Sequence, residues 1–176
     1  FNRYSDSIFN PDIYNDLIRI KDIWQETNRS GRKIIFAGNG GSAAMASHCS
    51  VDLTKNAGIR AINFNEADLI TCFANDYGYE DWVARAVEFY GIRGDSIVLI
   101  SSSGKSMNMV KAAEKTKQLG ISIVTFTGFD TDNKLKQAGE VNLWVDSKAY
   151  NIIEMTHHIW LLAIVDMLIG TAEYSA

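Results

Sequence analysis

Two short runs of small and hydroxyl-bearing residues are the first candidates for chemistry in this sequence. Gly38 to Ala43 reads G-N-G-G-S-A, and Ser101 to Ser106 reads S-S-S-G-K-S. Glycines let the backbone turn tightly and bring its N–H groups close to an anion, and serine hydroxyls at a helix start add further donors. Because phosphate oxygens only accept hydrogen bonds, both runs predict phosphate-binding loops.

Each loop also has a purely structural explanation. A glycine-rich turn between a strand and a helix is often only a tight turn, and serines at helix starts are often only N-caps. Neither loop is a G-x-G-x-x-G, and the second lacks the spacing of G-x-x-x-x-G-K-[ST], which argues against a Walker-type nucleotide site. Lys105 either offers charge to a ligand or is a solvated lysine in the first turn of a helix.

Histidines and carboxylates form a second group of candidates. His48 and Asp52 are four residues apart, so on a helix they share one face and could hold a metal ion or form a local hydrogen-bonded pair. The other two of the three histidines are His157 and His158, and Glu154 lies four residues before His158. These side chains could supply general acid–base chemistry, or the two later histidines could be buried in the core or in a subunit interface.

The rest of the chain predicts the elements that position these residues. Apolar runs without alternation indicate buried strands, and apolar residues at helical spacing indicate amphipathic helices. The expected strands are 33–37, 60–64, 96–100, 121–126 and 141–145, and the expected helices are 11–30, 42–55, 66–74, 79–90, 107–119, 132–138 and 150–170.

This order of elements predicts an α/β protein, a three-layer α/β/α sandwich with a central parallel sheet of four or five strands, doubly wound and flavodoxin-like. We expect one domain over residues 1–176, with a leading helix at about 11–30, the sheet and crossover helices over 33–146, and a closing helix at about 150–170. Ligands bind beyond the carboxyl ends of the strands in such sheets, which is where both loops fall. Asn75 to Gly78 is expected to be a turn.

Composition excludes several functional classes. With 47% hydrophobic residues, 22% charged residues and a net charge of −4, the chain has the profile of a globular protein without a broad basic surface for nucleic acid. Cys49 and Cys72 form no C-x-x-C pair, so a reduced, cytoplasmic setting is expected. No uninterrupted apolar run reaches the roughly 18 residues of a membrane span. The sequence begins at Phe1 without a signal-peptide pattern, so we expect a few leading residues to be absent from it.

Together the two loops resemble those of the sugar-isomerase (SIS) fold, in which G-N-G-G-S-A and S-x-S-G-x-S loops surround a sugar phosphate. The resemblance is strongest to the sedoheptulose-7-phosphate isomerases, also called phosphoheptose isomerases, and it covers essentially the whole chain. The leading helix, the first loop through His48, the N-D-Y-G-Y-E stretch at Asn75 to Glu80, the serine loop and the closing helix follow in that family's order. The residues that this resemblance places at the sugar phosphate are Asn39, Gly40, Gly41, Ser42, Asp76, Ser101, Ser102, Ser103 and Ser106.

The resemblance also implies a zinc-dependent isomerisation, and here the chain departs from the family. The family uses a histidine and a glutamate after the first loop, and a glutamine and a histidine on the closing helix. His48 and Asp52 stand at the first two positions, but Ile153 and Leu161 stand at the other two and can neither bind a metal nor carry a proton. Zinc is therefore expected only in a rearranged site of His48, Asp52 and His157, with metal-free acid–base chemistry as the alternative.

We expect an aldose–ketose isomerase that converts sedoheptulose 7-phosphate to a heptose 7-phosphate for lipopolysaccharide or capsule, with Asp52, His157 and Glu154 as catalytic candidates. One alternative is a non-catalytic sugar-phosphate-binding or interaction protein, like the replication-initiation partner related to this family. The other is a metal-free isomerase of another sugar phosphate that uses Glu154 and His158. The closing helix is apolar on nearly every side, which predicts a homo-oligomer, and the resemblance implies a tetramer with sites at subunit interfaces. Neither nucleic acid nor a membrane is expected as a direct partner.

Overall fold

Five parallel strands form the centre of the protein in a computed structural model, which describes residues 2–8 and 11–174. The strands are β1 (Ile34–Gly38), β2 (Ala61–Asn63), β3 (Ser96–Ser101), β4 (Ser122–Thr127) and β5 (Val141–Trp144). Their order in the sheet is β2-β1-β3-β4-β5, and every neighbouring pair is parallel. This is the predicted doubly wound, flavodoxin-like arrangement, in which the chain reverses its direction across the sheet after β2.

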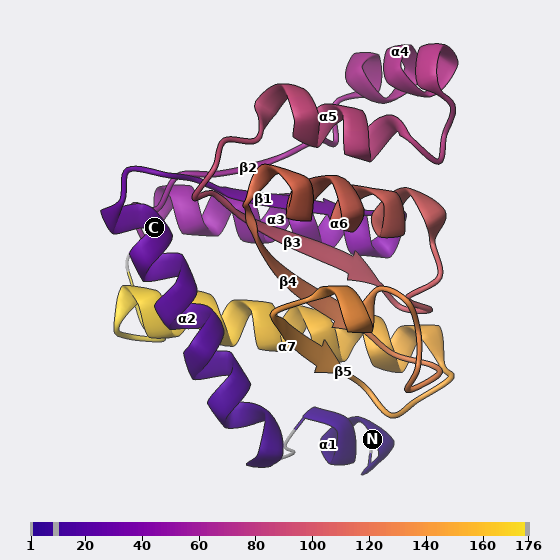
Figure 1. The fold of residues 1–176 in the computed structure, drawn as a ribbon. Helices are drawn as coiled ribbons and strands as arrows, with labels where there is room; N and C mark the ends of the chain where they lie inside the picture. The colour runs from indigo at the N-terminus through magenta and orange to yellow at the C-terminus, as the bar shows by residue number, and fades with distance from the viewer. Residues whose placement is uncertain (1, 9–10, 175–176) are drawn as a thin grey trace.

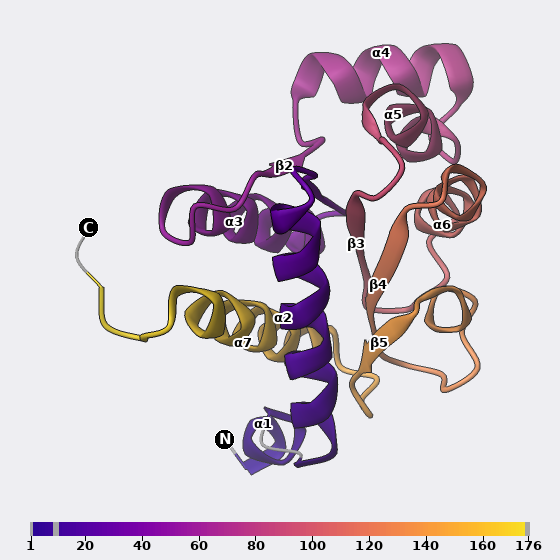
Figure 2. The ribbon, with the colours of Figure 1, turned by 60° about the vertical axis from the view of Figure 1, so that its left-hand side comes forward.

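Helices cover both faces of the sheet (Figures 1 and 2). One face carries α2 (Tyr14–Arg29), α3 (Gly41–Lys55) and α7 (Tyr150–Ile169), and the other carries α5 (Trp82–Tyr90) and α6 (Met107–Leu119). Two helices lie outside these layers: α1 (Asn2–Ile8) beside α7, and α4 (Ala67–Tyr77) beyond α5. Two short 3-10 helices lie at Pro11–Ile13, before α2, and at Lys136–Ala138, before β5.

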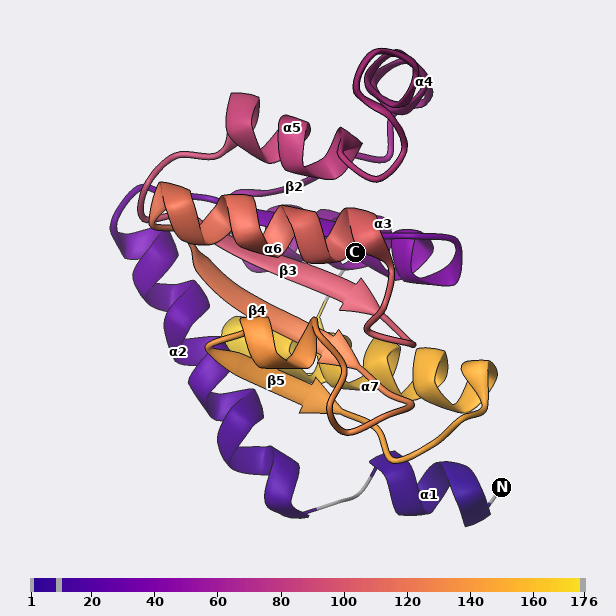
Figure 3. The ribbon, with the colours of Figure 1, turned by 45° about the vertical axis from the view of Figure 1, so that its right-hand side comes forward.

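Two separate apolar cores explain why the strands lack alternation. Ile34 and Phe36 of β1 point into the core under α2, α3 and α7, whereas Ile35 and Ala37 point into the core under α5 and α6. All five residues of β1 and all six of β3 are buried, because each strand presents apolar side chains to both layers. Because β1 and β3 pair in parallel, their carboxyl ends reach the same edge of the sheet, where both phosphate-loop candidates begin. Figure 3 shows the arrowheads of β3, β4 and β5 pointing to that edge.

The closing helix α7 is only partly buried within a single chain, so the expectation that an oligomer covers its remaining apolar side stays a prediction. Its inner face packs into the core through residues such as Ile153, Leu161 and Ile164. Its outer face leaves Met155 and Ile159 exposed. By length and composition α7 would be able to cross a membrane, but its contacts with the sheet, α2 and α3 make it a core helix of this fold.

Three further segments differ from the prediction. Helix α4 continues through Asn75, Asp76 and Tyr77 and ends at Gly78, so the expected turn at 75–78 is mostly helical. The helix expected at 132–138 shrinks to residues 136–138, because the Asn133 side chain takes over the hydrogen bonds of a helical turn. Its Nδ2 donates to Asp130 O at 2.8 Å, and its Oδ1 accepts from Lys136 N at 2.8 Å. Helix α1 was not expected, and its last residue, Ile8, accepts a hydrogen bond from the Trp160 indole at 3.1 Å.

Candidate functional site

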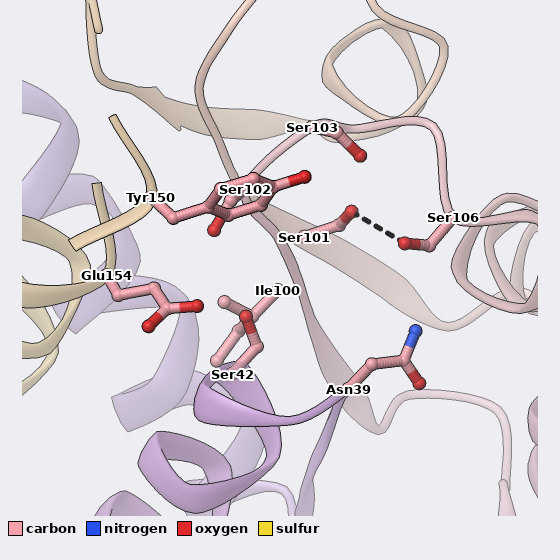
Figure 4. Close-up of a pocket in the computed structure, with 9 residues that line it drawn as sticks. All are labelled: Asn39, Ser42, Ile100, Ser101, Ser102, Ser103, Ser106, Tyr150 and Glu154. Carbon is pink, nitrogen blue, oxygen red and sulfur yellow. Dashed lines mark hydrogen bonds between the residues drawn. The ribbon is translucent and has the colours of Figure 1, made fainter. Parts of the chain in front are cut away.

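A pocket of about 130 Å³ opens at the carboxyl edge of the sheet, between the ends of β1 and β3 and the start of α7 (Figure 4). Its walls are hydroxyl, amide and carboxylate groups over one apolar floor residue, Ile100. The lining residues are Asn39, Ser42, Ile100, Ser101, Ser102, Ser103, Ser106, Tyr150 and Glu154. The structure therefore brings together both loops that the sequence singled out, with six of the nine predicted sugar-phosphate residues in one lining.

The serine loop forms the upper wall of the pocket as drawn in Figure 4. Ser101 Oγ donates to Ser106 Oγ at 3.2 Å, which joins the end of β3 to the N-cap position of α6. Ser103 Oγ accepts the Lys105 N–H at 3.2 Å and shapes the turn between them. Gly104 adopts a φ of +62° and packs directly against the Asn133 side chain, so any larger residue there would be strained and would clash. The loop thus presents several hydroxyls and the start of a helix to one small space.

The first loop forms the lower wall and touches the closing helix. Ser42, in the first turn of α3, is buried and lines the pocket. A Cβ on Gly41 would lie 2.6 Å from Glu154 Oε2, so only glycine lets the start of α3 approach this carboxylate so closely. Gly40 and Gly41 do not line the pocket themselves. They act through the backbone path that brings Ser42 and Glu154 together.

Glu154 is the one ionisable carboxylate in this lining. Among residues 2–8 and 11–174, no side chain forms a hydrogen bond or ion pair with it, so its oxygens remain available to a ligand. None of the lining residues carries a positive charge. Lys105 points away and pairs with Asp130, with Nζ and Oδ2 2.7 Å apart, and this hydrogen bond raises the pKa of the Lys105 amine. The basic residue of the serine loop therefore serves the loop's exterior rather than the pocket.

A second polar cluster lies along the partly exposed seam between α3 and α7. His48 Nε2 lies 3.2 Å from Asp52 Oδ2, and His48 Nδ1 lies 2.9 Å from His158 Nε2. A neutral His48 that donates its Nε2–H to Asp52 has a bare Nδ1, which then accepts from His158. Burial, and then the charge of His48, lower the pKa of His158, while Asp52 acts in the opposite direction. None of these three residues lines the pocket, so Asp52 is not positioned there as the expected base.

His157 was the wrong choice as a catalytic and metal-binding histidine. Its side chain is completely buried against the sheet, where Nε2 lies 2.9 Å from Thr127 O and the ring packs edge-on against Phe126. Burial lowers the pKa of His157 to about 4, although the hydrogen bond to Thr127 acts in the opposite direction. Successive residues of a helix differ by about 100° in direction, so His158 faces the seam while His157 faces the core.

The residues present do not fit the zinc site that the resemblance implied. Ile153 and Leu161, at the positions of the expected glutamine and histidine, are fully buried members of the apolar core. The rearranged set of His48, Asp52 and His157 fails because His157 points into that core. No group of three His, Cys, Asp or Glu side chains within the described ranges is arranged to hold a metal ion.

Asp76 is not brought to the pocket either. It lies in the last turn of α4, where its carboxylate accepts from Asn75 Nδ2 at 2.9 Å and contacts Cys72 Sγ at 3.7 Å. The expectation that it approaches the sugar hydroxyls is therefore not met within this chain, because α4 lies outside the helical layer that borders the pocket (Figure 2).

Sequence reasoning did not single out Tyr150. Its ring lines the pocket and packs against Phe129 with 5.0 Å between ring centroids. Phe129 is the one non-glycine residue among those described with a left-handed backbone, at φ +55°, which is an uncommon conformation for a bulky residue. The position of Tyr150 at the start of the last helix, just beyond the final strand, was a signal that could have identified it.

Comparisons with known proteins identify chains of similar sequence and fold. Residues 12–128 match the family described as the SIS domain. The phosphoheptose isomerase of Helicobacter pylori strain HPAG1 is 37% identical over 149 residues, covering 81% of this chain and 77% of that protein. That of Akkermansia muciniphila is 34% identical over 148 residues, covering 81% and 78%. The solved structure of the phosphoheptose isomerase of Neisseria gonorrhoeae superposes with a TM-score of 0.86 at 25% identity, covering 94% of this chain and 92% of that one.

Proposed function

The chain belongs to the SIS domain family, and we propose that it is a sugar-phosphate isomerase that interconverts sedoheptulose 7-phosphate and an aldoheptose 7-phosphate. The names of its relatives support the heptose substrate, and the pocket supports the chemistry. The observation that carries the proposal is the position of one unpaired carboxylate, Glu154, across a small pocket from a loop of serines.

The serine loop is suited to the phosphate group. Hydroxyls of Ser101, Ser103 and Ser106 can donate to phosphate oxygens, and the first backbone N–H groups of α6 have no partner within the helix. Ser42 supplies a further donor from the start of α3. A phosphate held by these neutral donors leaves the sugar chain extending along the pocket towards Glu154.

Glu154 is suited to the proton transfer. In the direction from ketose to aldose, its carboxylate removes a proton from C1 and leaves an enediolate; return of that proton to C2 produces the aldose. The proton on the C1 hydroxyl moves to the oxygen at C2 in the same conversion. The Tyr150 hydroxyl, which lines the same pocket, is our candidate for handling this second proton. This assignment replaces Asp52 and His157, which do not reach the pocket.

No step of this proposal passes through a metal. Two of the four positions that would hold zinc in the resembling family are Ile153 and Leu161, both buried in the apolar core. We therefore propose the metal-free form of the chemistry, in which positioning and the pocket's hydrogen-bond donors stabilise the enediolate.

We further propose that the protein works as a cytoplasmic homotetramer that supplies heptose for lipopolysaccharide or capsule. Support for an oligomer comes from apolar side chains exposed on the outer faces of three helices that cover one side of the sheet. They are Tyr14 and Ile18 on α2, Val51 on α3, and Met155, Ile159 and Met167 on α7. Light scattering of the purified chain would give its mass, and a monomer at micromolar concentration would contradict this part of the proposal.

A second candidate function is a sugar-phosphate binder without catalysis. It is favoured by one specific observation: in place of the histidine that the resembling family uses as acid or base, this chain has Leu161, which is fully buried. Such a protein would keep the serine loop and bind the same ligand, and it could act through a partner in replication initiation.

Conversion of sedoheptulose 7-phosphate, followed by NMR with EDTA or with added Zn²⁺, separates these functions. We expect turnover in EDTA, a loss of about 10²–10⁴-fold in Glu154→Gln, and unchanged ligand binding in that variant. Asp52→Asn is the matched control, because its carboxylate lies outside the pocket. Binding without turnover in the wild type would support the binder, and loss of turnover in Asp52→Asn alone would move the base to the histidine cluster.

A further inference from the structure

The side-chain amide of Asn39, on the pocket wall, is held by three hydrogen bonds. Its Nδ2 donates to Asn108 Oδ1 at 3.0 Å, and its Oδ1 accepts from Asn108 Nδ2 at 2.8 Å. The same Oδ1 accepts from the Tyr79 hydroxyl at 3.1 Å. Asn39 and Asn108 thus form a reciprocal amide pair that joins the end of β1 to the start of α6, and Tyr79 adds a third bond from outside.

The direction of this amide pair is fixed by the backbone of α6. The Met109 N–H, shared with Ser106 O, lies 3.1 Å from Asn108 Oδ1. An N–H can only donate, so the atom of Asn108 that faces it must be the oxygen. Asn108 Nδ2 then faces Asn39 and requires an oxygen there, which sets the orientation of Asn39 as well. Rotation of either amide by 180° would place two donors or two acceptors face to face.

One N–H of Asn39 is left over by this arrangement. An amide nitrogen has two hydrogens, and Asn39 Nδ2 uses one of them on Asn108. Figure 4 shows this nitrogen turned towards the serine loop and the amide oxygen turned away from it. We infer that Asn108 is a positioning residue, which holds Asn39 so that its free N–H donates to the phosphate of the substrate; this inference rests on the proposed function.

Burial and charge both favour this role for Asn108. Its side chain is 3% exposed, so its amide groups need partners, and Asn39 supplies two of them. The pocket lining has no positive charge, so each neutral donor that faces the phosphate contributes a larger share of its binding. A flipped Asn39 would present a carbonyl oxygen to the phosphate oxygens, and two acceptors repel each other.

Tyr79, Asn39 and Asn108 form a chain of hydrogen-bonded side chains, called the relay below, and Tyr79 connects it to the segment between α4 and α5. Although its side chain is 56% exposed, the loop that carries it is tied to α6. Lys111 Nζ lies 3.2 Å from Glu80 Oε2 and 2.8 Å from Asp81 Oδ2. The loop therefore holds the Tyr79 hydroxyl in front of Asn39. We therefore attribute the role of the N-D-Y-G-Y-E stretch in the site to the hydrogen bond between Tyr79 and Asn39 and not to a direct contact between Asp76 and the sugar.

Titration calorimetry with inorganic phosphate and with sedoheptulose 7-phosphate tests the relay. We expect Asn39→Ala and Asn108→Leu each to weaken binding of both ligands on the order of tenfold, the value of one hydrogen bond to a charged group. The double variant should be no weaker than either single variant, because Asn108 acts only through Asn39. Asn142→Leu is the matched control: its amide oxygen accepts from Thr125 and Thr127 on β4, away from the pocket, and ligand binding should not change.

Four outcomes have distinct meanings. The positioning role of Asn108 would be overturned if a folded Asn108→Leu variant bound both ligands with wild-type affinity. It would also be overturned if the losses of affinity in the two single variants added up in the double variant. Should Asn108→Leu fail to fold, Tyr79→Phe replaces it, because that exposed residue loses only one hydrogen bond. We then expect a two- to fivefold weaker affinity for both ligands. An unchanged affinity in Tyr79→Phe would overturn the relay. A wild type that binds both ligands without turnover would contradict the isomerase but not the relay. A wild type that binds neither ligand would overturn both.

Discussion

The pocket at the sheet edge and the histidine cluster between α3 and α7 contain similar functional groups in different states. In the pocket, Glu154 has no protein partner among the described residues and faces a space of ligand size. In the cluster, Asp52 and His158 both bond to His48, so the three groups satisfy one another. Unpaired polar groups around a cavity can act on a ligand, whereas a self-paired cluster of the same residue types first has to open.

The two adjacent histidines of α7 also differ in their surroundings. His157 is sealed in the core and bonds to a backbone carbonyl, while His158 faces the seam and bonds to His48. The phase of a helix therefore decides whether an imidazole contributes to stability or to surface chemistry. The predictions below test this division, in order of decreasing effect.

The largest effect concerns His157 and the pH dependence of stability. Its pKa is about 4 in the folded chain, against 6.5 for the ordinary side chain, so the unfolded state binds the proton more readily. Stability is therefore complete above about pH 6.5 and is lost as the pH falls towards 4, by about 3 kcal/mol in total from this group. Urea unfolding of wild type and His157→Leu between pH 8 and pH 4 measures this loss.

In that comparison, the slope that belongs to His157 should be absent from His157→Leu and present in His158→Leu. Equal slopes in wild type and His157→Leu would mean that His157 is not the group that destabilises the fold in acid. At pH 8 the His157→Leu variant is expected to be less stable than the wild type by about 1 kcal/mol, because Thr127 O loses its side-chain partner.

The second effect concerns the contact between the first loop and the closing helix. Gly41→Ala places a methyl group where the Glu154 carboxylate lies, so we expect kcat to fall by about 10²-fold, the effect of displacing a group by about an ångström. Phosphate affinity should change less than threefold, because the serine loop is untouched. Unchanged kcat in Gly41→Ala would indicate that the position of Glu154 does not limit the reaction.

The third effect is that of the Tyr150 hydroxyl. Tyr150→Phe keeps the ring that packs on Phe129 and removes only the hydroxyl. If the hydroxyl handles a proton of the substrate, kcat should fall about tenfold with little change in KM. Tyr150→Leu, which also removes the ring contact, separates the two roles: a further rise in KM is expected. Full activity in Tyr150→Phe would remove this hydroxyl from the proposed chemistry.

The smallest effect is expected from the histidine cluster. His48→Gln removes the imidazole that joins Asp52 to His158, yet turnover should stay within twofold because none of these groups lines the pocket. The unfolding free energy should change by about 1 kcal/mol or less, as is usual for a largely exposed polar contact. A loss of activity larger than tenfold would show that the histidine cluster takes part in the reaction and would contradict the functional difference between the cluster and the pocket.

These differences show which parts of the site could be read from the sequence. The serine loop and the glycine loop were predicted because each is contiguous, and its place between a buried strand and a helix fixes the edge of the sheet that it occupies. Glu154 and His157 were both named from their spacing on one helix, but spacing gives no absolute rotation about the helix axis. His157 was chosen because it lies one turn from both Ile153 and Leu161, and the structure buries all three residues, so the stripe that they share faces the core instead of the pocket.

Other features depend on contacts that local patterns do not contain. The Asn39–Asn108 pair joins residues from two crossover units, and Tyr150 reaches the pocket through its packing on Phe129. The fold was more predictable, since five apolar runs separated by helices leave few alternatives to a doubly wound parallel sheet. The segment at 75–78 was misread because turn-forming residues also serve as the last turn and cap of a helix.

The contact of Gly41 with Glu154 also has a consequence for how the protein assembles. These residues stand at the first loop and in the last helix, so most of the chain lies between them. The serine loop forms from neighbouring residues and can take shape as soon as β3 and α6 pack. Glu154 borders the same pocket only because α7 packs on the sheet, so the complete lining depends on a contact between distant parts of the chain, whereas the serine loop depends on neighbouring residues.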